Sequence, residues 1–285
     1  MKESLTSSTL FNTIAMARHE SVFLILVTEG PDDSVAIREH VGAEVQLISG
    51  VGGRLGVLEA AERAEKARLR SIFFVIDADY DRFMDEHVSY PQGVIATKFH
   101  DLFMDIVLES QPLLERILEV HLRSATRSPK SRVVPPRELI EAAMRLATTL
   151  GTLRVVNEKE GFGLRLRNFP LGELSLRDEL RSQMAELAIR RTPESVVQVD
   201  QLVGLMGAHQ LPRSLDSNHL VGDHDFFGAL AVAANKLVKI AVSGDTLFNG
   251  LLLSLRCDAF VSLAQSGTAV EELMTRNILA CPCAA

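Results

Sequence analysis

The 285-residue sequence has no long apolar run, and this shortage limits what the protein can be. No run reaches the roughly 18 residues of a membrane span, since the best candidate, residues 237 to 255, is broken by Lys239 and Asp245. The first 20 residues carry acids and lack the continuous apolar core of a secretory signal. We therefore expect a cytoplasmic protein that does not enter a membrane.

Cysteine is scarce and tryptophan is absent. The three cysteines, Cys257, Cys281 and Cys283, make an odd count that is typical of a reducing compartment rather than of a disulfide framework. The Cys-x-Cys of the tail has no second pair to complete a zinc site, so we expect a free terminus there. With 47% hydrophobic and 24% charged residues, the composition is that of a soluble globular protein.

Basic residues are outnumbered, 30 against 37 acidic ones, which leaves a net charge of −7. This balance argues against a protein that coats nucleic acid without specificity. Residues 123 to 137 are an exception, because they hold five basic residues and no acid. Two interpretations stay open: an island in which Arg127, Lys130 and Arg132 bind substrate phosphates, or a solvated Pro/Ser-rich loop between domains.

The first hundred residues alternate between strand and helix patterns. Short apolar runs predict strands at 21 to 27, 43 to 49, 72 to 77 and 93 to 97, with helices at 31 to 40 and 57 to 70 between them. Such alternation predicts the α/β class, with a parallel four-stranded sheet and right-handed crossovers.

The rest of the chain is mainly helical by pattern. We expect helices at 101 to 119, 138 to 151, 173 to 191 and 194 to 209, and a hairpin at 154 to 169 around Gly161 and Gly163. A soft boundary in the proline-containing stretch 128 to 136 divides the chain into an α/β domain, residues 1 to 125, and a mainly helical domain with a small hairpin, residues 126 to 285.

Acidic residues follow two of the predicted strands. Asp77, Asp79 and Asp81 come at every second position after the third strand, and in an extended chain residues two apart share a face. Carboxylates so near to one another repel unless a cation binds between them. Glu29 ends the first strand, and the carboxyl ends of parallel strands lie at one edge of a sheet. We therefore expect Glu29 to share a site with Asp77 and Asp79.

A carboxylate cluster without matching His or Cys favours a hard cation such as Mg²⁺, or Mn²⁺ in its place. Mg²⁺ held in this way is typical of phosphoryl chemistry, and Glu29 can serve as a further ligand or as the acid/base. The residues predict cleavage or transfer of a phosphodiester. The alternative is a set of solvated acids at turns, and acids after strands also occur in response-regulator and haloacid-dehalogenase phosphotransfer sites.

Three other segments allow a functional and a structural interpretation. The turn GVGGRLG (50 to 56) lacks the Gly-Lys-Ser/Thr of a phosphate loop, so we expect a tight turn with Arg54 near a substrate phosphate. His100 and Asp101 follow the fourth strand and either face the metal or, for Asp101, cap a helix. For GDHDFF (222 to 227) we favour the start of a helix over a metal site.

VTEGPDD (27 to 33) and VIDADYD (75 to 81) together resemble the Toprim pattern of topoisomerases, bacterial primases, RecR proteins and OLD-type nucleases. The resemblance covers roughly residues 21 to 100. It implies a Toprim (Rossmann-like) domain with Glu29 as general acid/base, Asp77 and Asp79 as Mg²⁺ ligands and Asp81 as an optional third. Asp33 matches the family's E-G-x-x-D form, so we count it with the metal site.

A closer resemblance is to the prokaryotic Toprim subfamily that includes AriB, the effector of PARIS anti-phage systems. It is carried by the turn Gly52-Gly53-Arg54, by Phe99-His100-Asp101 and by GDHDFF, and it adds His100 to the catalytic candidates. The sequence departs from the subfamily in having Arg54 for a lysine. It departs again at Phe103, where an acid is expected and Asp105 is the nearest.

This resemblance implies a toxic endonuclease that is restrained by an ATPase partner of the ABC/SMC type, is released on phage infection and cleaves transfer RNA. We also expect a homodimer in the active form. A Toprim DNA nuclease and a non-catalytic Toprim-like binding module are the alternatives. The short basic island and the acidic total favour a compact footprint, and hence structured RNA over DNA.

Overall fold

The computed structural model describes residues 7–20, 24–85, 87–125, 134–176, 179–256, 260, 263 and 266–280. The substrate-binding candidates Arg127, Lys130 and Arg132 lie outside these residues, as do all three cysteines. The basic island and the tail are therefore left as predictions.

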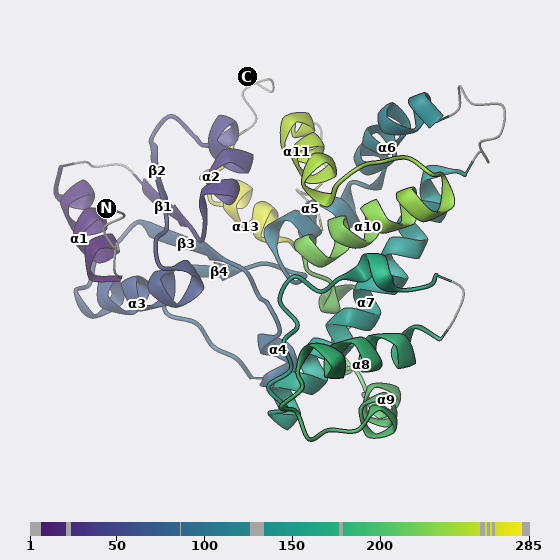
Figure 1. Ribbon diagram of the computed structural model, residues 1–285. Helices are drawn as coiled ribbons and strands as arrows, with labels where there is room; N and C mark the ends of the chain where they lie inside the picture. Colours follow the sequence, from purple (N-terminus) through teal and green to yellow (C-terminus); the bar gives the residue numbers. More distant parts are fainter. Residues whose placement is uncertain are drawn as a thin grey trace, which may run out of the picture. The chain divides into compact units, whose positions relative to one another are not determined.

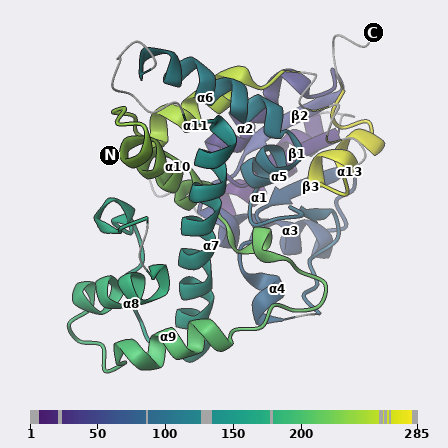
Figure 2. The ribbon, with the colours of Figure 1, turned by 90° about the vertical axis from the view of Figure 1, so that its right-hand side faces the viewer.

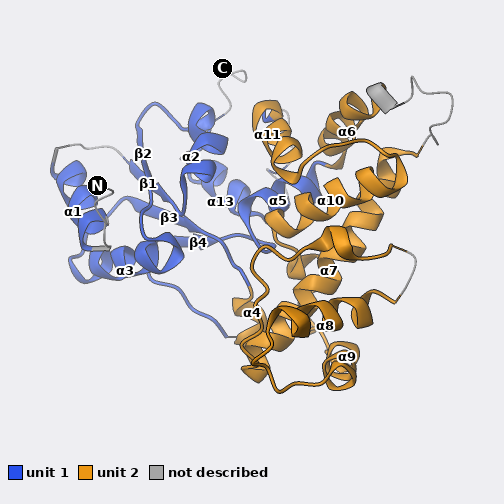
Figure 3. Cartoon of the chain, in the orientation of Figure 1, with its two compact units in different colours: residues 1–79, 87–110, 255–285 blue, residues 80–86, 111–254 orange. Residues whose placement is uncertain are grey.

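The chain forms two compact units (Figure 3), and neither is a single continuous stretch. Unit 1 comprises Met1–Asp79, His87–Ser110 and Leu255–Ala285, and unit 2 comprises Tyr80–Glu86 and Gln111–Ser254. This division differs from the boundary at 125/126 that the sequence suggested. Helix 111–125 packs with the helical unit, and the chain returns to the α/β unit after Ser254, because buried contacts rather than linker composition decide where a unit ends.

Unit 1 is built on a four-stranded parallel sheet in the order β2-β1-β3-β4 (Figure 1). The strands are β1 Leu24–Thr28, β2 Val45–Ser49, β3 Ile72–Ile76 and β4 Val94–Ala96. Thr28 pairs with Ser49 on one side and with Val75 on the other, so the central strands end level with each other. The α/β class, the parallel sheet and the helical region that follows are confirmed.

Helices cover both faces of this sheet, α1 and α3 on one side and α2 and α13 on the other (Figure 1). Their bounds are α1 Ser7–Glu20, α2 Pro31–Ile37, α3 Gly53–Lys66, α5 Leu102–Glu109 and α13 Ala269–Thr275, with a 3₁₀ turn η1 at Arg38–His40. Burial on both faces explains why β1 and β3 read as continuous apolar runs instead of alternating.

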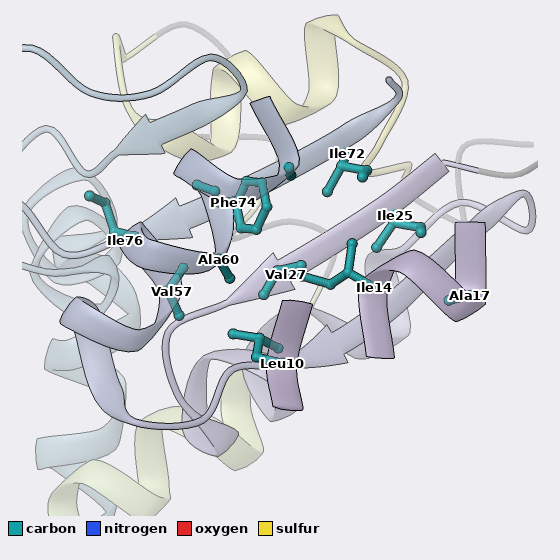
Figure 4. Close-up of a cluster of buried hydrophobic side chains, with 12 residues drawn as sticks. Leu10, Ile14, Ala17, Ile25, Val27, Val57, Ala60, Ile72, Phe74 and Ile76 are labelled. Carbon is teal, nitrogen blue, oxygen red and sulfur yellow. The ribbon is translucent and has the colours of Figure 1, made fainter. Parts of the chain in front are cut away.

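The core of unit 1 lies between the sheet, α1 and α3 (Figure 4). Leu10 and Ile14 of α1 and Val57 of α3 pack on Val27 and Phe74 of the two central strands. All five are at most 2% exposed. Removing a side chain of this size from water contributes about 1.5 to 3 kcal/mol, so this layer holds the sheet rigid behind the strand ends. The helix α1 had no counterpart in the sequence prediction.

Four of the described helices end in the same backbone motif, a residue with left-handed φ just past the last turn. These residues are Gly161 after α7 (φ 65°), Lys239 after α10 (φ 65°), Asn277 after α13 (φ 57°) and Arg68 after α3 (φ 56°). At α3 the motif is closed by bonds from Leu69 N to Ala64 O (3.0 Å) and from Arg68 N to Glu65 O (2.9 Å). Glycine and asparagine are common at such a position. An arginine there costs about 1 to 2 kcal/mol of backbone strain.

Unit 2 is helical and is organised around α7, Pro136–Glu160, the long upright helix of Figure 2. Helices α6, α8, α9 and α10 pack against it. The other elements are α4 Asp81–Met84, α6 Gln111–Ala125, η2 Leu171–Glu173, α8 Leu180–Arg191, α9 Val199–Ala208, η3 Ser217–Leu220, α10 Asp223–Leu237 and α11 Gly244–Ser254.

The predicted hairpin at 154 to 169 is wrong. Residues 154 to 160 are the last turns of α7, which runs past Gly151, the expected helix end, and stops at Gly161 instead. Gly151 is small for another reason, because a Cβ there would lie 1.9 Å from the carbonyl oxygen of Leu220. The single helix predicted at 101 to 119 is two helices, α5 and α6, separated at Ser110.

No helix within the described ranges is both long and apolar enough to cross a membrane.

Candidate active site

Glu29 follows β1 directly, and its carboxylate reaches the end of β3. Glu29 Oε2 accepts a hydrogen bond from the backbone N–H of Asp77 at 3.2 Å. Partial burial raises the pKa of Glu29, the Asp77 N–H opposes this, and the charge of Asp33 adds to the rise. The structure thus brings together the two strand ends that lie 48 residues apart in the sequence.

Asp77 is the centre of the acidic group. Its Oδ1 accepts a hydrogen bond from the N–H of Leu102 at 3.3 Å. Burial raises the pKa of Asp77 strongly, and repulsion from the carboxylates of Asp101, Asp33, Glu29 and Asp79 raises it further. A carboxyl group so placed holds its proton well above the usual range unless a cation joins it.

Asp79 is positioned by a turn and not by a strand. β3 ends at Ile76, and Asp79 has a left-handed φ of 45°. The expected two-residue alternation of an extended chain is therefore wrong here. Asp79 N donates to His100 O at 2.9 Å, and Ala78 N donates to Thr97 Oγ1 at 2.9 Å. The segment after β4 thus shapes the D-x-D turn.

A guanidinium and an imidazole face the Asp79 carboxylate. Arg54 Nη1 lies 3.5 Å from Asp79 Oδ2, and His100 Nε2 lies 3.9 Å from Asp79 Oδ1. Arg54 belongs to the first turn of α3, which the glycine turn presents to this edge. In that turn a Cβ on Gly50 would lie 2.4 Å from Thr28 O, so only glycine fits beside the end of β1.

The remaining predicted ligands have different surroundings. Asp33 is buried, and its Oδ2 accepts the N–H of Gly30 at 2.8 Å, which closes the turn after Glu29 and starts α2. Asp81 begins α4 and belongs to unit 2. The site described here is built from residues of unit 1.

His100 and Asp101 form a pair beside the acids. His100 Nδ1 lies 3.2 Å from Asp101 Oδ2. Asp101 Oδ1 accepts the N–H of Met104 at 2.8 Å and so caps α5, which is the structural alternative that the sequence left open. Asp101 does both at once, because it caps the helix while its charge acts on Asp77.

Two buried polar residues that were not candidates hold this loop. Thr97 Oγ1 donates to Phe99 O at 3.1 Å while it accepts from Ala78. Asp105 is 0% exposed, and its two oxygens accept the N–H groups of Phe99 (2.8 Å) and Lys98 (3.1 Å). Burial raises the pKa of Asp105 to about 6. The available signal was one acid within the otherwise apolar stretch LFMDIVL, residues 102 to 108.

The donor chemistry of this edge fits a hard cation. Glu29, Asp77 and Asp79 offer carboxylate oxygens, the ligands that Mg²⁺ prefers, and a divalent ion would relieve the repulsion around Asp77. Among the residues that the structure describes, however, no group of three or more His, Cys, Asp or Glu side chains is arranged to hold a metal. Backbone N–H groups already engage one oxygen each of Glu29, Asp77 and Asp101.

The segment GDHDFF lies in unit 2, where it begins α10 after Gly222. Asp225 accepts two hydrogen bonds from Arg154 of α7, at 2.7 and 2.9 Å. The favoured interpretation of this segment, a helix start, agrees with the structure.

Neither a scan against protein-family models nor a search of curated proteins finds a match to this chain. The Toprim and AriB-like resemblances therefore rest on the sequence motifs and remain predictions.

Proposed function

We propose that unit 1 is a metal-dependent phosphodiesterase of the Toprim type that cleaves nucleic acid. The observation that carries this proposal is the convergence of Glu29, Asp77 and Asp79 at the carboxyl ends of β1 and β3, where the pKa of Asp77 is raised by burial and by its acidic neighbours. Perturbed carboxyl groups at such an edge are characteristic of functional sites.

Each residue has a defined part in this proposal. Glu29, whose pKa is raised, transfers the proton to or from the reacting oxygen. Asp77 and Asp79 would hold Mg²⁺, with Asp33 closing the turn behind them. A bound Mg²⁺ would neutralise phosphate charge and stabilise the oxygen that leaves. Arg54 and His100, which lie 3.5 and 3.9 Å from Asp79, would orient the phosphate.

The direct test is cleavage of labelled RNA and DNA by the purified protein with Mg²⁺ or Mn²⁺. Glu29→Gln and Asp77→Asn preserve shape while removing the charge, and each is expected to lower the rate by about 10² to 10⁴-fold. Asp32→Asn is the matched control, since Asp32 is an exposed acid of the same turn. Equal rates for Glu29→Gln and the wild type would refute the assignment.

The finer features come from the resemblance alone. We propose transfer RNA as the substrate, a role as a toxic effector of anti-phage defence, restraint by an ATPase partner of the ABC/SMC type and a homodimer as the active form. Expression without a partner would then arrest growth and cleave tRNA. Arrest with intact tRNA and broken DNA would favour the DNA nuclease instead.

A non-catalytic binding module is the second candidate. It is favoured by the contacts that Arg54 and His100 already make with Asp79 and by the backbone hydrogen bonds that Glu29 and Asp77 already accept. Under this alternative the Glu29→Gln protein keeps its full effect in cells.

A further inference from the structure

A second polar cleft opens in unit 1, at the amino-terminal ends of β3 and β4 and therefore at the opposite end of these strands from the carboxylates. Its volume is about 640 Å³, within the roughly 300 to 1,000 Å³ of ligand sites. Three arginines line it, Arg68 and Arg70 after α3 and Arg276 after α13, together with Glu65, Glu272 and the half-buried Phe73.

Arg276 is held in place before any ligand arrives. Its guanidinium lies 5.2 Å from the centre of the Phe73 ring. Its Nε and Nη2 bind Glu272 Oε1 at 3.1 and 2.6 Å. Stacking on an aromatic face while one edge is paired fixes the plane of a guanidinium, so less freedom is lost when it binds an anion.

Arg68 and Arg70 are exposed, and neither forms an ion pair with any residue that the structure describes. They are not needed to cap α3, because its last carbonyl groups already accept backbone N–H groups of Ala67, Arg68 and Leu69. The two positive charges are therefore not used by the fold around them.

Arg68 also stands where the backbone favours another residue. Its φ of 56° is the left-handed value that Gly161, Asn277 and Lys239 adopt at the ends of α7, α13 and α10. Glycine would close this turn without strain. A strained non-glycine residue at a cleft is a reason to look for a function of its side chain.

We propose that this cleft binds the phosphate backbone of a nucleic-acid strand. Exposed guanidinium groups hold a single small anion weakly, because water and salt screen the attraction. A polyanion releases counterions at every contact and gains much more from the same groups. The inference rests on the proposed function, since it adds a second contact for the same substrate.

The distance suits such a substrate. β3 has five residues, so the cleft and the carboxylates are separated by about 17 Å at 3.3 Å per residue. One strand of a duplex covers that length with about five phosphates. Because helices cover both faces of the sheet (Figure 1), a nucleic acid that contacts both ends has to pass around unit 1, which takes more than these five phosphates.

The test measures binding without cleavage. The full chain is titrated, in EDTA, into a fluorescein-labelled RNA hairpin and into a DNA duplex of the same sequence, and anisotropy gives the affinity at two salt concentrations. Arg70→Ala and Arg68→Gly are each expected to weaken binding about threefold or more and to lower the salt slope by about one contact. Arg68→Gly should do so with an unchanged or higher Tm, because it relieves the backbone.

Two controls match these variants. Arg38→Ala removes an exposed arginine of the same unit outside the cleft, so it changes the net charge equally. Asn277→Gly changes the corresponding left-handed residue after α13 without changing charge. Both should bind as the wild type does.

The outcomes separate this inference from the proposed function. If Arg68→Gly and Arg70→Ala bind with the affinity and salt slope of the wild type, the proposal that the cleft binds nucleic acid is wrong. The proposed nuclease activity is unaffected by that result and is tested separately by Glu29→Gln. Weakened binding in a protein that never cleaves would support the cleft and refute the nuclease. No binding by the wild type, or displacement of the hairpin by ATP at equal phosphate concentration, would overturn the polynucleotide as occupant.

Discussion

A single buried carboxylate organises the loop beside the candidate site. The buried carboxylate of Asp105 accepts the N–H groups of Lys98 and Phe99 in place of water. These two residues immediately precede His100 and Asp101 in the sequence. Where the AriB-like subfamily suggests an acid as a ligand, this chain has Asp105, a carboxylate that accepts backbone N–H groups. These hydrogen bonds explain how an acid is accommodated on the buried face of α5.

Asp105→Asn is expected to lower the free energy of unfolding by about 1 to 3 kcal/mol. An amide keeps one acceptor but turns an NH₂ group toward a backbone N–H, which leaves a buried donor unpaired. Urea unfolding at pH 7 measures the loss. A variant as stable as the wild type would show that Lys98 N finds another acceptor.

The difference in stability between the wild type and Asp105→Asn should depend on pH. The folded pKa of Asp105, about 6, lies above its value in an unfolded chain, so the folded state binds more protons between about pH 4 and 6. The contribution of this group is therefore full at low pH and lost as the pH rises through 6. The stability gap between wild type and Asp105→Asn should widen by about 2 kcal/mol from pH 7 to pH 4.5. A constant gap would contradict the raised pKa.

Asp77→Asn should stabilise the fold while it removes activity. The change relieves the repulsion from neighbouring acids, and an amide oxygen can still accept the N–H of Leu102. We expect a gain of about 0.5 to 2 kcal/mol, the usual exchange of function for stability at such sites. Thermal unfolding without divalent ions measures it, and a lower Tm would show that the acids do not repel one another.

At the scale of elements, close approach of backbones decides where helices can pack. α7 meets η3 at Gly151, where there is no room for a methyl group beside Leu220 O. The glycine that would end a helix by sequence rules is thus a contact point in the middle of one. Gly161, with its left-handed φ, has the ending role instead.

Gly151→Ala is expected to cost about 1 to 3 kcal/mol, because α7 and η3 must move apart. Gly204→Ala on the exposed face of α9 has the opposite expectation. It meets nothing within 4 Å and should add about 0.5 to 1 kcal/mol through helix propensity. Chemical denaturation measures the free energy of unfolding of both variants. A change of the same sign in the two variants would contradict the close packing at Gly151.

At the scale of the whole molecule, the last residues of the chain complete the unit that the first residues begin. Leu279 forms a bridge with Val41, Gly42 N donates to Ile278 O at 3.0 Å, and Lys98 Nζ donates to Ser266 O at 2.8 Å. Residues 266 to 280 are therefore part of the packing of unit 1.

Truncating buried side chains of this segment should weaken the sheet. Leu273→Ala and Ile278→Ala remove side chains that are 1% and 0% exposed, and each is expected to cost about 2 to 5 kcal/mol. Leu253→Ala, 88% exposed, should stay within about 0.5 kcal/mol of the wild type. Hydrogen exchange in β1 and β3 measures the effect, and unchanged protection there would mean that the segment is dispensable.

Prediction from the sequence succeeded where the information is local. β1, β3 and α3 were located from apolar runs and helical spacing, and the meeting of Glu29 with Asp77 followed from parallel strands ending at one edge. It failed at α7, where Gly151 was taken for a terminator, and at Asp79, where an extended chain was assumed.

The amino-acid sequence by itself determined the α/β class, the parallel direction of the strands and the acids at the strand ends. Periodicity and crossover rules act on single elements and on the connections between them, so they can be applied without the tertiary structure. Only the tertiary structure decided that Asp105 binds backbone N–H groups, that Arg54 and His100 face Asp79, and that residues 266 to 280 belong with the sheet. Those outcomes depend on which distant groups share a buried space, and that is a property of packing rather than of local pattern.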